Sequence, residues 1–272
     1  MKIALSTHLF VYNTLDENIL SEMASFGFKN IEVWCGNPHF DYGNESSVET
    51  VGKLIKKFNL IPLSFHGPIY MNVADAKKKE WLSLADINEN KRKKAVGEFK
   101  KAIFAMESVG AKFIVTHIGN TGDPFTEEGF KAFIKSLELL LFLAEKNGII
   151  IALENIISEL SSYDVIEKIL KQFKSENLAV CLDLGHAKIA GGISNGIEKF
   201  GSKIISLHVH DNNGIKDEHL VPGTGIINWD MVGQRLSPYN EGFVLEMRDF
   251  GNIPEILLET KKFLKGFLSH GY

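Results

Sequence analysis

The stretch "LAVCLDLGHAKIAGG" at residues 178–192 decides the fold. It begins with an apolar run that ends on Asp183, and His186 follows three positions later, ahead of a series of small residues. A short, almost continuous apolar run of this kind is typical of a parallel strand that is buried on both faces. The stretch therefore predicts a buried strand whose carboxyl end presents an acid and an imidazole.

Seven further runs of the same kind follow one another along the chain, separated by longer amphipathic stretches. Two of these stretches, residues 91–111 and 126–148, have helical periodicity and stop at Gly110 and Gly148, as helices often do. Strand and helix alternating eight times predicts a (β/α)8 TIM barrel of the α/β class. The predicted strands are residues 2–6, 30–34, 61–65, 112–117, 149–154, 178–183, 204–209 and 242–247.

Length and composition favour one domain. The chain has 272 residues, 44% of them hydrophobic, and no linker or shift in composition divides it. We therefore predict a single TIM-barrel domain over residues 1–272. The start of the chain has the pattern of a first strand rather than a secretion signal, and no apolar run is long enough to cross a membrane. Cys35 and Cys181 lie in apolar runs, which predicts reduced core thiols and a cytoplasmic protein.

The charge of the chain argues against nucleic acid as a partner. The formal net charge is -4, and the sequence contains three arginines, whereas tight DNA binding needs several contacts from Lys or Arg to phosphate. The lysine runs at 77–79 and 91–94 are typical of solvated helix faces. We expect a small-molecule partner, and the sequence leaves open whether the chain forms a homo-oligomer.

Histidine and carboxylate side chains recur where the predicted strands end. In a (β/α)8 barrel the C-terminal strand ends carry the catalytic groups. Charges buried at six consecutive strand ends are costly unless they are paired or bound to a metal, and a mixed His/Asp/Glu set suits Zn²⁺, Mn²⁺ or Co²⁺. The pattern therefore predicts a divalent metal site. The candidate residues are His66, His117, Glu154, Asp183, His186, His208, His210, Asp211, Asp217, His219, Glu246 and Arg248.

Several features near the strand ends have less certain roles. Residues 68–88 form the longest irregular segment and are a candidate lid over a site. Trp34 and Trp81 could stack on a ligand, although packing explains them equally well. We expect His8 to be structural and His270, in the C-terminal tail, to be exposed.

The ordered motifs resemble those of a known superfamily. They are "SFHGP", "VTHIG", "ALEN", "CLDLGHA", "LHVHDN", "DEHLVPGTG" and "VLEM", and together they extend over nearly the whole chain. This set is similar to the xylose isomerase-like TIM-barrel superfamily. That group contains sugar and sugar-phosphate isomerases and epimerases, and also DNA repair enzymes of the endonuclease IV type that act at abasic sites.

The resemblance to the ketose 3-epimerase branch implies one divalent metal ion, Mn, Co, Mg or Zn. Four groups would hold it: Glu154, Asp183, His208 and Glu246. Glu154 and Glu246 would also be the catalytic carboxylates, moving a proton through a metal-stabilised enediolate, and His186 would contact oxygens of the sugar. For His66 and His117, and for Asp217 and His219, substrate binding or a second metal remain open.

The resemblance to the endonuclease IV branch implies up to three zinc ions. All nine of its ligand positions are filled here, so the ligand types alone do not separate the branches. The implied ligands are His66, His117, Glu154, Asp183, His186, His208, Asp217, His219 and Glu246.

Other features favour the sugar enzymes. The runs "LDLGHAKIAGG" and "HVHDNNG" are closer to that branch, and the net charge is acidic. Two departures leave the sugar open: Glu159 is one residue short of the expected second glutamate, and His219 replaces an expected arginine. We therefore expect a metal-dependent sugar or sugar-phosphate isomerase or epimerase. The alternative is an endonuclease IV-like zinc phosphodiesterase acting on abasic DNA, and a non-catalytic metal-binding barrel is the third hypothesis.

Overall fold

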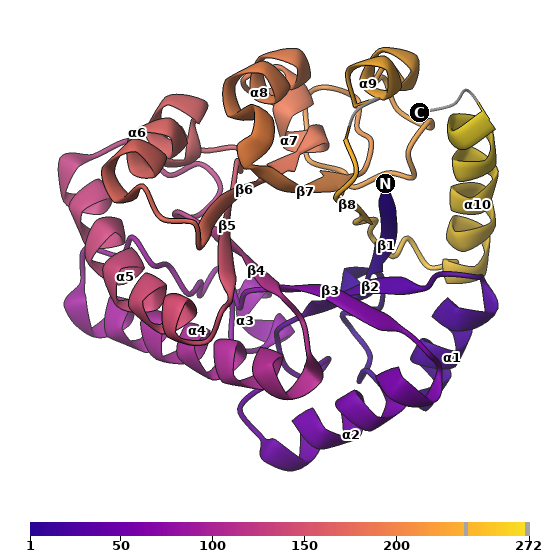
Figure 1. The fold of residues 1–272 in the computed structure, drawn as a ribbon, viewed down its shortest axis with the longest axis horizontal. Helices are drawn as coiled ribbons and strands as arrows, with labels where there is room; N and C mark the ends of the chain where they lie inside the picture. The colour runs from indigo at the N-terminus through magenta and orange to yellow at the C-terminus, as the bar shows by residue number, and fades with distance from the viewer. Residues whose placement is uncertain (237–238, 270–272) are drawn as a thin grey trace.

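The computed structural model describes residues 1–236 and 239–269, so His270 lies outside the described residues. Eight parallel strands pair in chain order, and β1 also pairs with β8, which closes the sheet into a barrel (Figure 1). The predicted (β/α)8 fold is confirmed. The strands are β1 (Lys2–Ser6), β2 (Asn30–Trp34), β3 (Ile61–His66), β4 (Phe113–His117), β5 (Ile150–Glu154), β6 (Leu178–Asp183), β7 (Ile204–Val209) and β8 (Gly242–Leu245).

Helices alternate with the strands and cover the outside of the barrel (Figure 1). Local sequence sets their ends: the Thr126 hydroxyl accepts a hydrogen bond from the Gly129 N–H at the start of α5, and Gly110 ends α4 with a φ of 93°. Within the described residues, no helix is long and apolar enough to span a membrane. The α-helices are α1 (Glu17–Ser25), α2 (Glu45–Lys57), α3 (Val73–Lys77), α4 (Glu89–Val109), α5 (Glu127–Lys146), α6 (Tyr163–Phe173), α7 (Leu184–Ile189), α8 (Ile193–Phe200), α9 (Trp229–Leu236) and α10 (Ile253–Ser269), and the 3-10 helices are η1 (Thr7–Phe10), η2 (Glu159–Ser161) and η3 (Gly201–Lys203).

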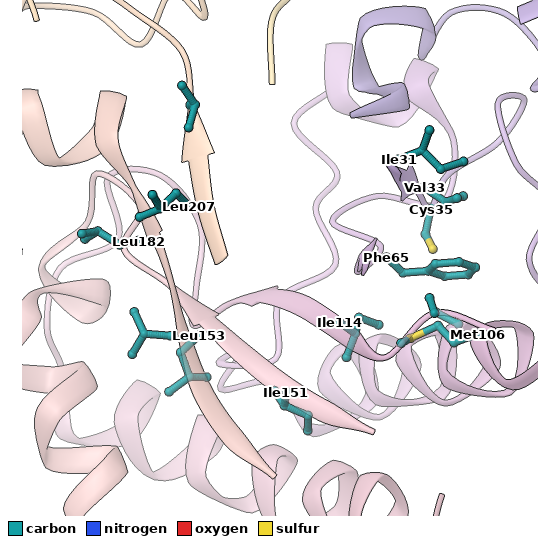
Figure 2. Packing of buried hydrophobic residues seen from close by; sticks show 14 of the residues in the cluster. Ile31, Val33, Cys35, Phe65, Met106, Ile114, Ile151, Leu153, Leu182 and Leu207 are labelled. Atoms are coloured by element: carbon teal, nitrogen blue, oxygen red, sulfur yellow. The ribbon is translucent and has the colours of Figure 1, made fainter. Parts of the chain in front are cut away.

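Two apolar layers hold the strands. Residues such as Phe65 and Ile114 pack between the barrel and the surrounding helices (Figure 2). A smaller cluster that includes Val115 and Cys181 packs separately from it. Both cysteines, Cys35 and Cys181, are free thiols and buried. Burial on both faces explains why the strand sequences are almost continuously apolar.

Strand β8 ends earlier than the sequence predicts. The expected strand runs to Met247, but pairing with β1 stops at Leu245, because β1 turns into η1 at that level. Glu246 is therefore the first residue beyond the strand. Its backbone N–H still donates to the Val209 carbonyl at 3.1 Å, which keeps Glu246 at the mouth of the barrel.

The predicted lid, residues 68–88, is more ordered than expected. It contains α3, whose start is closed by a reciprocal pair of hydrogen bonds. The Asn72 side chain accepts from the Ala74 N–H, and the Asp75 carboxylate accepts from the Asn72 N–H. The capping box explains why a short helix forms in a segment without helical periodicity.

Candidate metal centre

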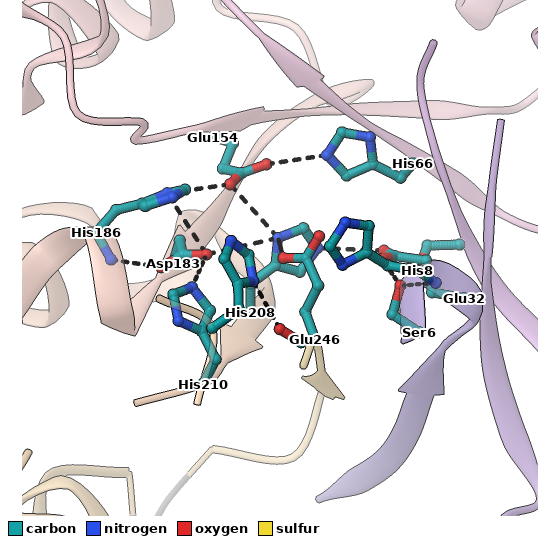
Figure 3. A network of polar contacts seen from close by, with 12 residues as sticks. Ser6, His8, Glu32, His66, Glu154, Asp183, His186, His208, His210 and Glu246 are labelled. Carbon is teal, nitrogen blue, oxygen red and sulfur yellow. Dashed lines mark hydrogen bonds and ion pairs between the residues drawn. The ribbon is translucent and has the colours of Figure 1, made fainter. Parts of the chain in front are cut away.

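The C-terminal end of the barrel brings together all nine residues that the endonuclease IV resemblance implies as ligands. Figure 3 labels His66, Glu154, Asp183, His186, His208 and Glu246 among them. Because the strands are parallel, each strand end delivers its side chain to the same mouth. Their roles as ligands or catalysts remain predictions. His66 ends β3, His117 β4, Glu154 β5 and Asp183 β6, while His186 lies in α7, His208 in β7, Asp217 and His219 in the loop after β7, and Glu246 directly after β8.

The first donor group consists of Glu154, Asp183, His208 and Glu246. One potential ligand atom from each lies within 4.8 Å of all the others. Nδ1 of His208 is 3.1 Å from the Glu246 carboxylate and 3.5 Å from that of Glu154. Carboxylates and an imidazole gathered within this radius suit a divalent cation.

The second donor group, His66, His117 and Glu154, shares Glu154 with the first. Nε2 of His66 and Nε2 of His117 lie 3.4 Å and 3.2 Å from Oε2 of Glu154. The other oxygen, Oε1, lies 3.5 Å from Nδ1 of His208. The two oxygens of one carboxylate thus face two donor groups, so Glu154 could bridge two cations.

The third donor group contains His186, His210, Asp217 and His219. Nε2 of His186 and Nε2 of His219 lie 3.3 Å and 3.1 Å from Oδ2 of Asp217. His210, a strand-end candidate that is in neither implied ligand set, also contacts the centre: its Nε2 is 3.1 Å from Oδ2 of Asp183. It therefore stands between the first and third groups.

Several buried polar atoms of the centre have no hydrogen-bond partner among the described residues. An unpaired buried donor or acceptor costs stability, and such atoms usually mark a missing ligand or a functional site. All of these atoms belong to ligand-type side chains of the donor groups, so the residues present fit divalent cations. The atoms are Oε2 of Glu154, Oδ1 of Asp217, and Nδ1 of His186, His208 and His210.

Backbone carbonyls fix the orientation of two of the histidines. A carbonyl oxygen only accepts, so Nδ1 of His66 donates to Gly67 at 2.9 Å and Nδ1 of His219 donates to Glu246 at 2.7 Å. In the neutral ring this leaves the Nε2 lone pair directed at the donor group. His8, expected to be structural, also has a potential ligand atom within 4.8 Å of those of His219 and Glu246, and burial lowers its pKa to about 3.

Burial and neighbouring charge oppose each other in the centre. Burial alone would raise the pKa values of Glu154 and Glu246, but nearby histidines, His208 first, hold both well below their usual range. Burial alone would lower the pKa of His186, but carboxylates, Asp183 first, raise it well above its ordinary value. Ionised carboxylates therefore face histidines that hold protons, and a metal ion would displace those protons.

A cavity of about 420 Å³ includes members of all three donor groups in its lining. Another part of the lining is aromatic: the Trp34 ring stacks on His66 with centroids 3.8 Å apart, and its Nε1–H donates to the Tyr70 hydroxyl at 2.9 Å. Two exposed cations, Lys77 and Arg248, also line the cavity. This volume suits a small molecule.

Glu32 is a candidate that the strand-end pattern does not reveal. It lies in β2, has no exposed surface, and its carboxylate is 3.2 Å from Nε2 of His208. An acid inside the otherwise apolar run "NIEVW" is the sequence signal for it. Glu32 lies two residues before the end of β2, so the pattern of polar strand ends does not include it.

The chain matches the family model of the xylose isomerase-like TIM barrel over residues 20–267. It belongs to this family. The resemblance inferred from the motifs is therefore confirmed.

Relatives of the chain bear names from two classes of enzyme. A probable endonuclease 4 of Staphylococcus carnosus is 27% identical over 230 residues, which cover 78% of this chain and 71% of that protein. The crystal structure of a D-tagatose 3-epimerase-like protein is 26% identical, with a TM-score of 0.82 over 99% of this chain and 97% of that one. The crystal structure of an IOLI protein with a bound zinc atom is 19% identical, with a TM-score of 0.79 over 100% and 99%, which shows the shared fold alone.

Proposed function

We propose that this protein hydrolyses phosphate esters with a cluster of divalent cations. The observation that carries the proposal is Glu154, whose two carboxylate oxygens face two donor groups. The third group adjoins them, since His186 lies 3.3 Å from the carboxylates of both Glu154 and Asp217. Sites that hold two or more cations are typical of phosphatases and nucleases. This ranking differs from the expectation drawn from the sequence, which placed the sugar enzyme first.

In this proposal each donor group would hold one cation, and Glu154 would be a ligand in two of the groups. A set of imidazoles and carboxylates suits zinc, and a structural neighbour carries a zinc atom. When bound, the cations would neutralise phosphate charge and make a water molecule acidic enough to attack at neutral pH.

The side chains around the donor groups would bind the ester. Lys77 and Arg248 line the cavity and can pair with phosphate oxygens. The aromatic lining at Trp34 and Tyr70 would exclude bulk water. In the reaction the oxygen of water gives up a proton and bonds to phosphorus, the bond from phosphorus to the leaving oxygen breaks, and that oxygen takes up a proton.

For the substrate we propose a small phosphorylated molecule rather than duplex DNA. The net charge of -4 and the low number of arginines favour this choice. The relative named probable endonuclease 4 supports phosphoester chemistry in the family. A cytoplasmic location is part of the same proposal, because the two cysteines are free thiols.

Metal content and turnover together test the proposal. Elemental analysis of protein purified without chelator is expected to give more than one zinc per chain. The loaded protein is expected to cleave bis(p-nitrophenyl) phosphate or a panel of sugar phosphates, with a duplex containing an abasic analogue as the nucleic-acid comparison. One metal per chain with no release of phosphate or alcohol from any substrate would refute the proposal.

A sugar or sugar-phosphate isomerase or epimerase is the second candidate. It is favoured by the likeness to the D-tagatose 3-epimerase-like protein, and by Glu154 and Glu246, which both approach His208. One of these carboxylates would remove a proton beside a ketose carbonyl and the other would return one. Deuterium entering a ketose from heavy water, with one metal per chain, would support this candidate over the first.

A further inference from the structure

Glu32 has no exposed surface, and Figure 3 shows it beside Ser6 within the network of polar contacts. It is on β2, and its neighbours in register are Ser6 on β1 and Ser64 on β3. Both serine hydroxyls donate to its carboxylate, at 3.0 Å to Oε1 and 2.8 Å to Oε2. These two bonds hold the carboxylate in a single orientation, directed into the barrel.

The same carboxylate reaches across the barrel interior to β7. Oε2 of Glu32 lies 3.2 Å from Nε2 of His208, and neither side chain has any exposed surface. Among the described residues, His208 is the one titratable side chain that forms an ion pair with Glu32. A carboxylate buried without a positively charged or N–H partner is costly, so this contact is the reason that an acid is tolerated here.

The contact decides which nitrogen of His208 faces the donor group. A carboxylate oxygen accepts a hydrogen bond from Nε2–H, so Nδ1 is left to face Glu154, Asp183 and Glu246. Nδ1 is also one of the buried atoms without a hydrogen-bond partner. His66 and His219 are held in the opposite sense: their Nδ1 atoms donate to backbone carbonyls, so their Nε2 atoms face the donor groups. His208 differs from those two because its partner is a side chain that can be replaced.

We infer that Glu32 is the positioning residue of the first donor group, holding the Nε2–H of His208 so that Nδ1 binds a divalent cation. The inference rests on the proposed metal centre but not on phosphoester hydrolysis. Carboxylate–histidine–metal arrangements of this kind orient the ring and make it a stronger ligand. Loss of such a partner lowers metal affinity by roughly 10- to 100-fold.

The test replaces Glu32 with glutamine, which keeps its size and can still bond to the serines. Zinc affinity is measured by competition with a chromophoric chelator. We expect one ion per chain of Glu32→Gln to bind at least about tenfold more weakly, with the others unchanged. Ser64→Ala, which removes only a support of Glu32, should weaken the same ion less. Glu98→Gln alters a buried glutamate of α4 that bonds to Tyr42, and should bind zinc like the wild type.

A second readout follows the ring itself. In the nitrogen-15 spectrum of wild-type protein, the His208 Nε2–H should give a downfield signal protected from exchange, which Glu32→Gln shifts or abolishes. Unchanged zinc affinity and an unchanged Nε2–H signal in a folded Glu32→Gln protein would overturn the inference. If the wild type binds no metal, the proposed function fails, while the Nε2–H signal still tests the contact between Glu32 and His208.

Discussion

Two buried carboxylates at the mouth of the barrel, Asp211 and Glu154, have opposite surroundings. Both oxygens of Asp211 accept hydrogen bonds from groups that cannot titrate. Glu154 is surrounded by histidines, and its Oε2 has no hydrogen-bond partner among the described residues. The four donors to Asp211 are the backbone N–H groups of Asn212, Gly223 and Ile227 and the indole N–H of Trp229.

The difference shows that the burial of an acidic side chain does not by itself indicate a role in catalysis or metal binding. Backbone N–H groups are permanent donors, so Asp211 is fully satisfied and ties down the loop that runs from β7 to α9. The histidines around Glu154 can exchange their protons for a cation, and Oε2 has a lone pair to offer. Asp211 therefore supports the fold, whereas Glu154 supports the proposed reaction.

The largest effect is expected from Glu154→Gln. Glutamine cannot supply two anionic oxygens, so the first and second donor groups both lose a ligand. We expect kcat/KM to fall by roughly 10³-fold or more, since members of a catalytic unit act together. Elemental analysis should show fewer than the wild-type number of metal ions per chain, in a protein that remains folded by circular dichroism.

Glu159→Gln is the matched control for that variant. Glu159 is an exposed acid five positions later whose carboxylate accepts from the Phe125 N–H, away from the donor groups. Activity and metal content should stay within about twofold of wild type. If both variants lost activity and metal to the same extent, Glu154 would have no special role in the metal centre.

The next largest effect is a loss of folding stability, which we expect from Asp211→Asn. An asparagine side chain would direct an N–H₂ group at some of the four donors, leaving buried groups unpaired. We expect the free energy of unfolding, measured in urea, to fall by about 3 kcal/mol. The loop also carries Asp217 and His219, so at most the ion of the third group should be lost. Loss of all metal with unchanged stability would reverse the roles assigned to Asp211 and Glu154.

The fold could be predicted because its signals are local. Parallel strands buried on both faces have apolar sequences such as "LAVCLD", and each is followed by a polar residue at its end. The end of β8 at Leu245 could not be predicted, because it depends on where β1 turns away. The helix at Val73–Lys77 depends on the capping box of Asn72 and Asp75 rather than on hydrophobic periodicity.

The sequence predicts which side chains gather at the barrel mouth, but it does not predict which contacts they make with one another. Strand ends such as "ALEN" and "CLDLGH" indicate which side chains meet, since parallel strands deliver their ends to one mouth. The sharing of Glu154 between two groups depends on how closely His117 of β4 and His208 of β7 approach the end of β5, which no local pattern contains. The contact of Glu32 with His208 joins residues 176 positions apart and needs the closed barrel.

Metal removal should make stability depend on pH in a defined direction. Burial alone would lower the pKa values of His186, His208 and His219. Neighbouring groups outweigh burial, so that the pKa of each histidine in the folded protein is raised above the ordinary value of 6.5. A raised pKa in the folded state stabilises the metal-free protein below about pH 6.5, and this contribution is lost as the pH rises through the folded-state pKa. The free energy of unfolding of the metal-free protein should therefore decrease above neutrality.

Urea unfolding at several pH values, with and without zinc, checks this expectation. In the zinc-loaded protein the cations take the place of the protons, so its stability should rise with pH over the same interval. Glu154 and Glu246 have lowered pKa values, which add stability above about pH 4.5 that is lost in acid in the metal-free protein. A metal-free protein that gains stability between pH 7 and pH 9 would contradict the assigned shifts.

The smallest effect on activity is expected from Arg248→Ala. This variant applies the same comparison, between an unpaired and a paired side chain, to two arginines. Among the described residues Arg248 has no ion-pair partner, whereas Arg235 pairs with Glu198 at 2.6 Å. An unpaired guanidinium in the cavity lining is available to a phosphate, so its loss should raise KM about tenfold, as one charge-assisted contact does, with kcat nearly unchanged. Arg235→Ala should leave both constants unchanged. If the substrate were an unphosphorylated ketose, Arg248→Ala would leave KM unchanged as well, so this last variant separates a phosphorylated substrate from an unphosphorylated one by its kinetics alone.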